Sequence, residues 1–395
     1  MGFNKGVQKQ PKMNSEFKFT RYLYEVEEVI INLNIEILKK NSEKALWWAF
    51  ELFYSGYKIQ LTYELWYIYY NYFATSNPKF ETYLLTKINT EINDPTVLAS
   101  IINNFTIRPF NVDIFMLKNI STRENVTPCG EKCMNLLKKP TIKWELISSS
   151  IKNWSDEMNI ELVLTEIIEY INSIKKEATL NVATEIRKYK KTMKIPFNKN
   201  NKSVLLSRII YYFHLDNTKQ IGKNLFAEMD DDLNMYKTQL VDLTPQGIKS
   251  EYSRCPILPA RKILQVSRKG SIDEEGYLSL FDLKRDHSDI KKAFHFHWEY
   301  YASFSPIWAK RIESHNGVIN HTNKTVTFDE EGEDHDSFYD HFGYEPDEQL
   351  VTVQNMSIGR SEQTKSWVDF HKQFNKNGII KANKYIKQLV KVNRM

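Results

Sequence analysis

The sequence predicts a mainly α-helical protein, in which an irregular array of helical hairpins is followed by an α-rich domain with a small β-hairpin. Aromatic residues make up 13% of the 395 residues, whereas glycine and proline number only 13 and 12. Many large side chains and few breakers favour long, packed helices over a β-sandwich, which needs frequent turns. Apolar residues also recur at spacings of three and four in the first part of the chain, as on one face of a helix.

Five helices are expected in this first part. Ser42 is placed to cap the second helix and Gly56 to end it, because glycine readily adopts the left-handed conformation that follows a helix. Asp94 and Pro95 predict the start of the fifth helix in the same way. The five helices span residues 21–40, 42–56, 61–75, 78–92 and 94–105. Their hairpins differ in length, so we expect an irregular array and not a true repeat protein.

Further helices are expected at residues 142–153, 156–175 and 203–215. Near residue 255 the pattern changes to short apolar runs, and Tyr277–Leu283 is expected to form a strand. An aromatic helical segment follows at residues 290–315. Residues 318–320 and 325–328 then flank the polar stretch HTNK, which is typical of a β-hairpin. Helices return at residues 335–342, 346–356 and 362–375.

These patterns divide the chain into four parts. They are a disordered basic N-terminus (1–18), an all-α domain (19–255), an α-rich domain with the β element (256–372) and a basic amphipathic C-terminal helix (373–395). No stretch resembles a signal peptide or an apolar membrane span, so we expect a cytoplasmic protein without membrane contact. The three cysteines, Cys129, Cys133 and Cys255, lack the further ligands of a zinc site. They are interpreted as free thiols of a reducing compartment.

Two segments resemble a known group of proteins. EKALWWAFELFYSGYKIQLTYELWYIYYNYFATSNPKFE is similar to the amino-terminal helical region of uncharacterised helical proteins of nucleocytoplasmic large DNA viruses, the giant viruses. HWEYYASFSPIWAKRI and the later YEPDEQ are similar to the carboxy-terminal half of these proteins. The resemblance implies a viral origin, and with it a place in the host cytoplasm, the viral factory or the virion. It transfers no activity and no functional residue.

Basic stretches are the first candidate sites. Net charge is only +5, and the abundance of lysine, asparagine and isoleucine is typical of an A/T-rich genome, so much of the lysine excess is discounted. What remains is concentrated in two places: Arg187, Lys188, Lys190, Lys191 and Lys194 in one stretch, and Lys381, Lys384, Lys387 and Lys391 in the C-terminal segment. Such stretches bind phosphate backbones by releasing counterions. The alternative interpretation is a solvated lysine-rich face.

Histidine and carboxylate side chains form the second candidate. Eight of the nine histidines lie between residues 287 and 371, where they overlap the acidic segment 329–349. Both groups ligate divalent metals, which suggests metal-assisted hydrolysis by His295, His297, Asp334, Asp336 and His341. Their spacing matches no established metal motif, so a solvated acidic loop beside surface histidines is favoured.

Other chemistry finds little support. The sequence lacks the glycine-rich phosphate loops and the GxSxG motif, so nucleotide and serine-hydrolase sites are not expected. Trp298 and Trp308 suggest an aromatic sandwich for a cationic purine, but a core role is preferred. We therefore expect a non-enzymatic viral scaffold or adaptor that binds protein partners and needs no cofactor. A nucleic-acid-binding module and a metal-dependent phosphoester hydrolase remain as alternatives.

Overall fold

The protein is mainly α-helical, as predicted, with two small antiparallel sheets in the parts that the structure describes. The structure is a computed structural model. It describes residues 18–122, 165–169, 172–173, 180–193, 204–205, 207–208, 211, 225–228, 276–281, 297–329, 332–342, 365–374 and 388–391. The predicted helices at 142–153 and 346–356, the N-terminus up to residue 17 and all three cysteines lie outside these ranges. No helix in the described ranges is long and apolar enough to cross a membrane.

The chain divides into two compact units, each built from distant parts of the sequence. Unit 1 comprises residues 1–28, 239–272 and 282–359, and unit 2 comprises residues 29–238, 273–281 and 360–395. The single boundary expected near residue 255 differs from this division, because two later segments return to the unit of the helical array. They return through aromatic packing on the array, since the ring centroid of Phe115 lies 6.1 Å from that of Phe281 and 5.7 Å from that of Trp367.

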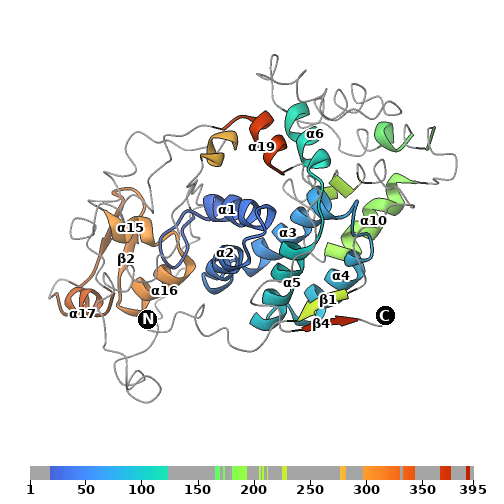
Figure 1. The fold of residues 1–395 in the computed structure, drawn as a ribbon. Coiled ribbons are helices and arrows are strands. Elements are labelled where there is room, and N and C mark those ends of the chain that lie inside the picture. The colour runs from blue at the N-terminus through green and yellow to red at the C-terminus, as the bar shows by residue number, and fades with distance from the viewer. Residues whose placement is uncertain are drawn as a thin grey trace, which may run out of the picture. The chain divides into compact units, whose positions relative to one another are not determined.

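The helical array follows the predicted order. Its helices are α1 (Val26–Leu38), α2 (Ser42–Tyr54), α3 (Lys58–Ile68), α4 (Phe80–Glu91), α5 (Pro95–Ile107) and α6 (Asp113–Thr122), and a π-helix, η1 (Tyr69–Phe73), continues α3. α2 packs against both α3 and α5, in blue to teal in Figure 1. Between Ala45 and Phe53 every residue of α2 is buried, which is expected of a helix that is apolar nearly all round.

Two of the predicted helix ends are confirmed and several others are displaced. Asp94 caps α5 by accepting a hydrogen bond from the Thr96 amide at 2.8 Å, and Gly56 has a φ of 90°. Asn41, and not Ser42, caps α2, while the Ser42 hydroxyl donates to the side chain of Asn103 and so joins α2 to α5. α1 begins only at Val26 because the preceding residues form a turn.

A two-stranded sheet closes one side of the array. β1 (Leu225–Glu228) pairs antiparallel with β4 (Gln388–Lys391), with Leu225 opposite Lys391. This pairing corrects the prediction of a C-terminal helix at residues 388–391. The segment has a helical spacing of apolar residues, but it forms a strand because it completes the backbone hydrogen bonds of the open edge of β1. β1 packs on α5, and Phe226 stacks on Tyr83 with ring centroids 4.3 Å apart.

Two short helices of unit 2 come from late in the chain. Residues 277–280 form a 3₁₀ helix, η3 (Tyr277–Leu280), where the sequence predicts a strand. Gly276 has a φ of 77° and starts this turn. Tyr277, Leu278 and Leu280 are all buried, which does not follow the alternation of a strand. α19 (Trp367–Phe374) lies within the predicted range 362–375 and packs its aromatic side chains against Phe115 of α6.

Unit 1 contains the predicted β-hairpin. β2 (Val318–Asn320) pairs with β3 (Thr325–Thr327), and the polar turn joins them. The aromatic segment before it forms two helices, α15 (Trp298–Ala302) and α16 (Pro306–Ser314), because Pro306 cannot continue a helix and opens a new one. α17 (Glu333–Phe342) follows the hairpin, and Figure 1 shows these elements in orange.

Candidate binding surface on helix α10

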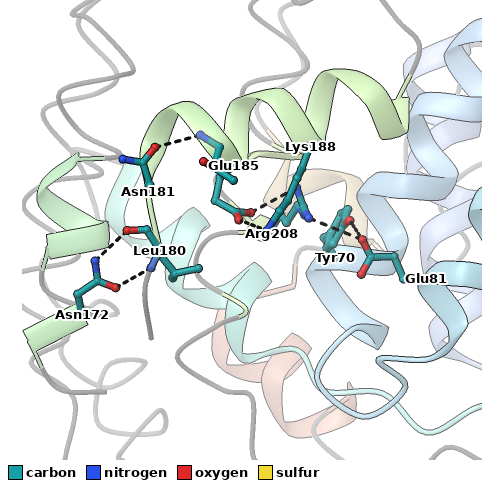
Figure 2. A network of polar contacts seen from close by, with 9 residues as sticks. Tyr70, Glu81, Asn172, Leu180, Asn181, Glu185, Lys188 and Arg208 are labelled. Atoms are coloured by element: carbon teal, nitrogen blue, oxygen red, sulfur yellow. Dashed lines mark hydrogen bonds and ion pairs between the residues drawn. The ribbon is translucent and has the colours of Figure 1, made fainter. Parts of the chain in front are cut away.

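The first basic stretch of the sequence forms helix α10 (Val182–Met193). Its start is fixed by hydrogen bonds, because the Asn181 side chain accepts from the Thr184 amide at 3.1 Å, as expected of a cap. The residue before this cap is held as well. The Leu180 amide donates to the Asn172 side chain at 3.1 Å, and the Asn172 amide group donates back to the Leu180 carbonyl at 2.9 Å (Figure 2). The helix therefore starts from a fixed point.

Three cations share one exposed side of α10. Arg187, Lys188 and Lys191 are all exposed, and we call this set the basic face. Residues at these spacings lie on one side of a helix. Glu185 is the only acidic residue of α10, lies about 160° around the helix axis from Arg187, and is only 1% exposed. The helix thus presents positive charge outward and turns its only carboxylate inward.

Glu185 is held by an ion-pair network whose centre, Glu185 and Arg208, is buried (Figure 2). One carboxylate oxygen lies 3.4 Å from the Arg208 guanidinium, and the other accepts from Lys188 at 2.9 Å. The other end of the guanidinium lies 3.9 Å from Glu81 of α4, and that carboxylate accepts the hydroxyl of Tyr70, in η1, at 2.8 Å. Arg208 therefore links α10 to α4 and η1, and holds the basic face in one position on the array.

The other predicted basic residues are described only in part. Lys190 lies in α10 and Lys391 lies in β4, but their side chains fall outside the described part of the structure. Lys194, Lys381, Lys384 and Lys387 lie outside the described residues altogether. That the two basic stretches bind nucleic acid or a partner stays a prediction.

The described members of the histidine and carboxylate set make separate contacts. His297 is exposed at the start of α15. Asp334 accepts a hydrogen bond from the Asn316 side chain at 2.9 Å, and Asp336 lies 3.4 Å from His335. Among the residues with described side chains, no three or more His, Cys, Asp or Glu come together in a way that could hold a metal ion. His295 and the side chain of His341 fall outside that set.

The two tryptophans of unit 1 lie in a core and do not form a sandwich. The rings of Trp298 and Trp308 meet edge to face at 88°, with centroids 5.5 Å apart. Trp308 is 1% exposed and donates its indole N–H to the Arg21 carbonyl at 2.9 Å. A planar ligand needs two parallel rings with a gap between them, so this pair is part of the packing, as preferred from the sequence.

Sequence reasoning missed a set of buried charges in unit 2. Glu64, Lys118 and Arg208 are each less than 9% exposed and lie within otherwise apolar or aromatic segments. That pattern was a usable signal, because an isolated charge on an apolar helix must find a partner inside the fold. The partners themselves come from distant segments, which spacing along the chain cannot reveal.

The chain matches no family model, no curated protein and no solved structure. The resemblance to giant-virus proteins therefore stays a prediction. The chemistry of the described residues is that of a binding surface: a fixed helix with cations outward and a buried anchor beneath.

Proposed function

We propose that the protein is a non-enzymatic helical adaptor that binds nucleic acid through the basic face of α10. The observation that carries this proposal is the division of charge on α10. The three cations of the basic face are exposed on one side, while the only carboxylate of the helix is buried against Arg208. Phosphate backbones are recognised by such positive surfaces, and the affinity comes largely from the release of counterions.

Rigidity supports the proposal. A solvated lysine-rich face needs no buried anchor, whereas the network of Glu185, Arg208 and Glu81 costs desolvation energy and holds α10 in one position. Cations that are already fixed lose less freedom when a partner binds. A protein partner within a viral assembly stays a prediction of the sequence.

Salt dependence of binding tests the proposal. The affinity of the full chain for a short labelled duplex DNA is measured by fluorescence anisotropy over a salt series, with a single-stranded RNA of equal length in parallel. The logarithm of the affinity falls with the logarithm of the salt concentration, and each lost phosphate contact makes this slope shallower by about 0.9 on duplex DNA. Arg187→Gln with Lys191→Gln should therefore make the slope shallower by about 2.

A matched control separates the basic face from charge in general. Lys79 and Lys310 are exposed and lie outside α10, so Lys79→Gln with Lys310→Gln removes the same net charge. This control should leave the slope nearly unchanged. Equal losses in both double variants, or no salt-dependent binding by the unaltered protein, would show that α10 is not the binding surface.

A further inference from the structure

Below the anchor of α10 lies a buried polar centre that the proposed binding does not use. The Lys118 side-chain nitrogen, on α6, donates to the Ser207 hydroxyl at 2.7 Å and to the Asn71 side-chain oxygen at 3.1 Å. The Ser207 hydroxyl in turn donates to that same Asn71 oxygen at 2.9 Å. Asn71 belongs to the π-helix η1, a distortion that occurs frequently at functional sites. Ser207 and Asn71 have no exposed surface.

This centre is joined to the α10 anchor through the backbone. Ser207 and Arg208 are consecutive helical residues, so one faces Lys118 while the next faces Glu185. Opening the segment that carries Arg208 would also remove Ser207 from Lys118 and admit water to the ammonium. Release of α10 and hydration of Lys118 are therefore coupled events.

We propose that the anchoring of α10 is proton-linked: the segment of Ser207 and Arg208 opens more readily when Lys118 binds a proton on exposure to water, and less readily at alkaline pH. The proposal rests on the proposed function only in one respect: if the basic face binds nucleic acid, this proton-linked opening would regulate how that face is presented. The device itself is a property of the free protein.

The direction follows from burial. Burial lowers the pKa of Lys118 to about 7, against a raising effect from the charge of Glu64. In an opened state the hydrated amine regains its usual pKa near 10.4. Between these values opening takes up a proton, so it becomes less favourable as pH rises from 7 and levels off below 7.

The neighbouring charges leave the upper part of this window clear. Burial raises the pKa of Glu64 to about 7, partly offset by the hydrogen bond from Asn34 and by Lys118, so Glu64 titrates at the lower edge of the window. Burial also raises the pKa of Tyr72 well above its usual range. The groups that face the centre or its attached anchor are Glu64 and Tyr67 from α3, Tyr72 from η1, Arg208 beside Ser207, Glu185 from α10 and Glu81 from α4.

Hydrogen exchange of the free protein tests the proposal without any nucleic acid. Exchange of the α10 amides is followed by mass spectrometry at pH 7.0 and pH 8.5 and divided by the intrinsic rate at each pH. The protection of α10 should rise by up to roughly tenfold between these values, less if opening hydrates Lys118 only in part. An unchanged or falling protection overturns the proposal, whatever the outcome of the nucleic-acid experiment.

Three variants assign the effect. Lys118→Met removes the titrating group, so the rise should vanish. Ser207→Ala is a smaller change that cuts the link, so it should lower protection and reduce the rise even if Lys118→Met fails to fold. Glu64→Gln keeps Lys118 and should keep the rise. If the protection of α10 still rises fully in Ser207→Ala, or if the rise is lost only in Glu64→Gln, a group other than Lys118 takes up the proton.

Discussion

Glu185 and Arg208 form a buried ion pair, with a carboxylate oxygen 3.4 Å from a guanidinium nitrogen and both side chains below 8% exposed. One residue belongs to α10 and the other to the segment beneath it. Buried pairs contribute little when both partners are replaced together, but the loss of one partner leaves an uncompensated charge in the interior. This asymmetry makes the pair a sensitive probe of how α10 is held.

Single and double replacement of this pair should therefore differ. Arg208→Met alone should lower the free energy of unfolding by about 3–5 kcal/mol, because the buried Glu185 then keeps only the half-exposed Lys188 beside it. Arg208→Met with Glu185→Gln should cost less than the single change. Urea unfolding measures both, and a double variant that loses the sum of two independent changes would contradict the close pairing.

Glu64 should make stability depend on pH in an unusual direction. Its pKa is raised by burial to about 7, so its contribution is fully present below the usual value near 4.5 and is lost as pH rises towards 7. Between pH 5 and pH 7 the unaltered protein should lose about 2 kcal/mol relative to Glu64→Gln, whose amide does not titrate. Urea unfolding at the two pH values measures this difference, and a constant gap between the two proteins would refute it.

The start of α2 tests the corrected helix cap. Because the Asn41 side chain accepts from the Lys44 amide at 3.2 Å, Asn41→Ala should destabilise the protein by about 1 kcal/mol. Asp94→Ala removes the equivalent bond at α5 and serves as the comparison, with a similar expected loss. Thermal unfolding of both variants gives the two values. If Asn41→Ala leaves the stability unchanged while Asp94→Ala lowers it, Asn41 is not the cap of α2.

Gly317 is a test of close packing in unit 1. A Cβ atom at this position would lie 2.6 Å from the Ile312 side chain and 2.9 Å from the Ile312 carbonyl oxygen. Gly317→Ala should therefore cost about 1–3 kcal/mol through overpacking. Gly332→Ala is a useful contrast, because its surroundings are open and only its φ of 82° opposes a side chain, which costs about 1–2 kcal/mol. Urea unfolding measures both single variants and the double variant, in which the two losses of stability should add.

Local signals were the predictable part of this fold. The Asp94–Pro95 start of α5, the stop at Gly56 and the hairpin at residues 318–327 are written within a few neighbouring residues, and the structure confirms them. Each depends on backbone chemistry that a short stretch decides for itself.

The remaining features depend on distant partners. Residues 388–391 have a helical spacing, yet they form β4 because the edge of β1 is available to them. The basic residues of α10 were visible in the sequence, whereas the anchor beneath them was not, since Glu185 meets Arg208 only after the chain folds back. Spacing along a chain describes one element at a time and does not report which elements meet.

The return of late segments to unit 2 has a consequence for synthesis on the ribosome. Phe115 packs on Trp367 and Phe370 of α19, with ring centroids 5.7 and 5.3 Å apart. At bacterial or eukaryotic translation speeds of about 5–20 residues per second, those partners emerge on the order of tens of seconds after Phe115. During that interval the part of Phe115 that α19 covers is open to water and to other nascent chains. A chaperone that shields aromatic surfaces should therefore raise the yield of folded protein more than it would for a protein whose units are continuous in sequence.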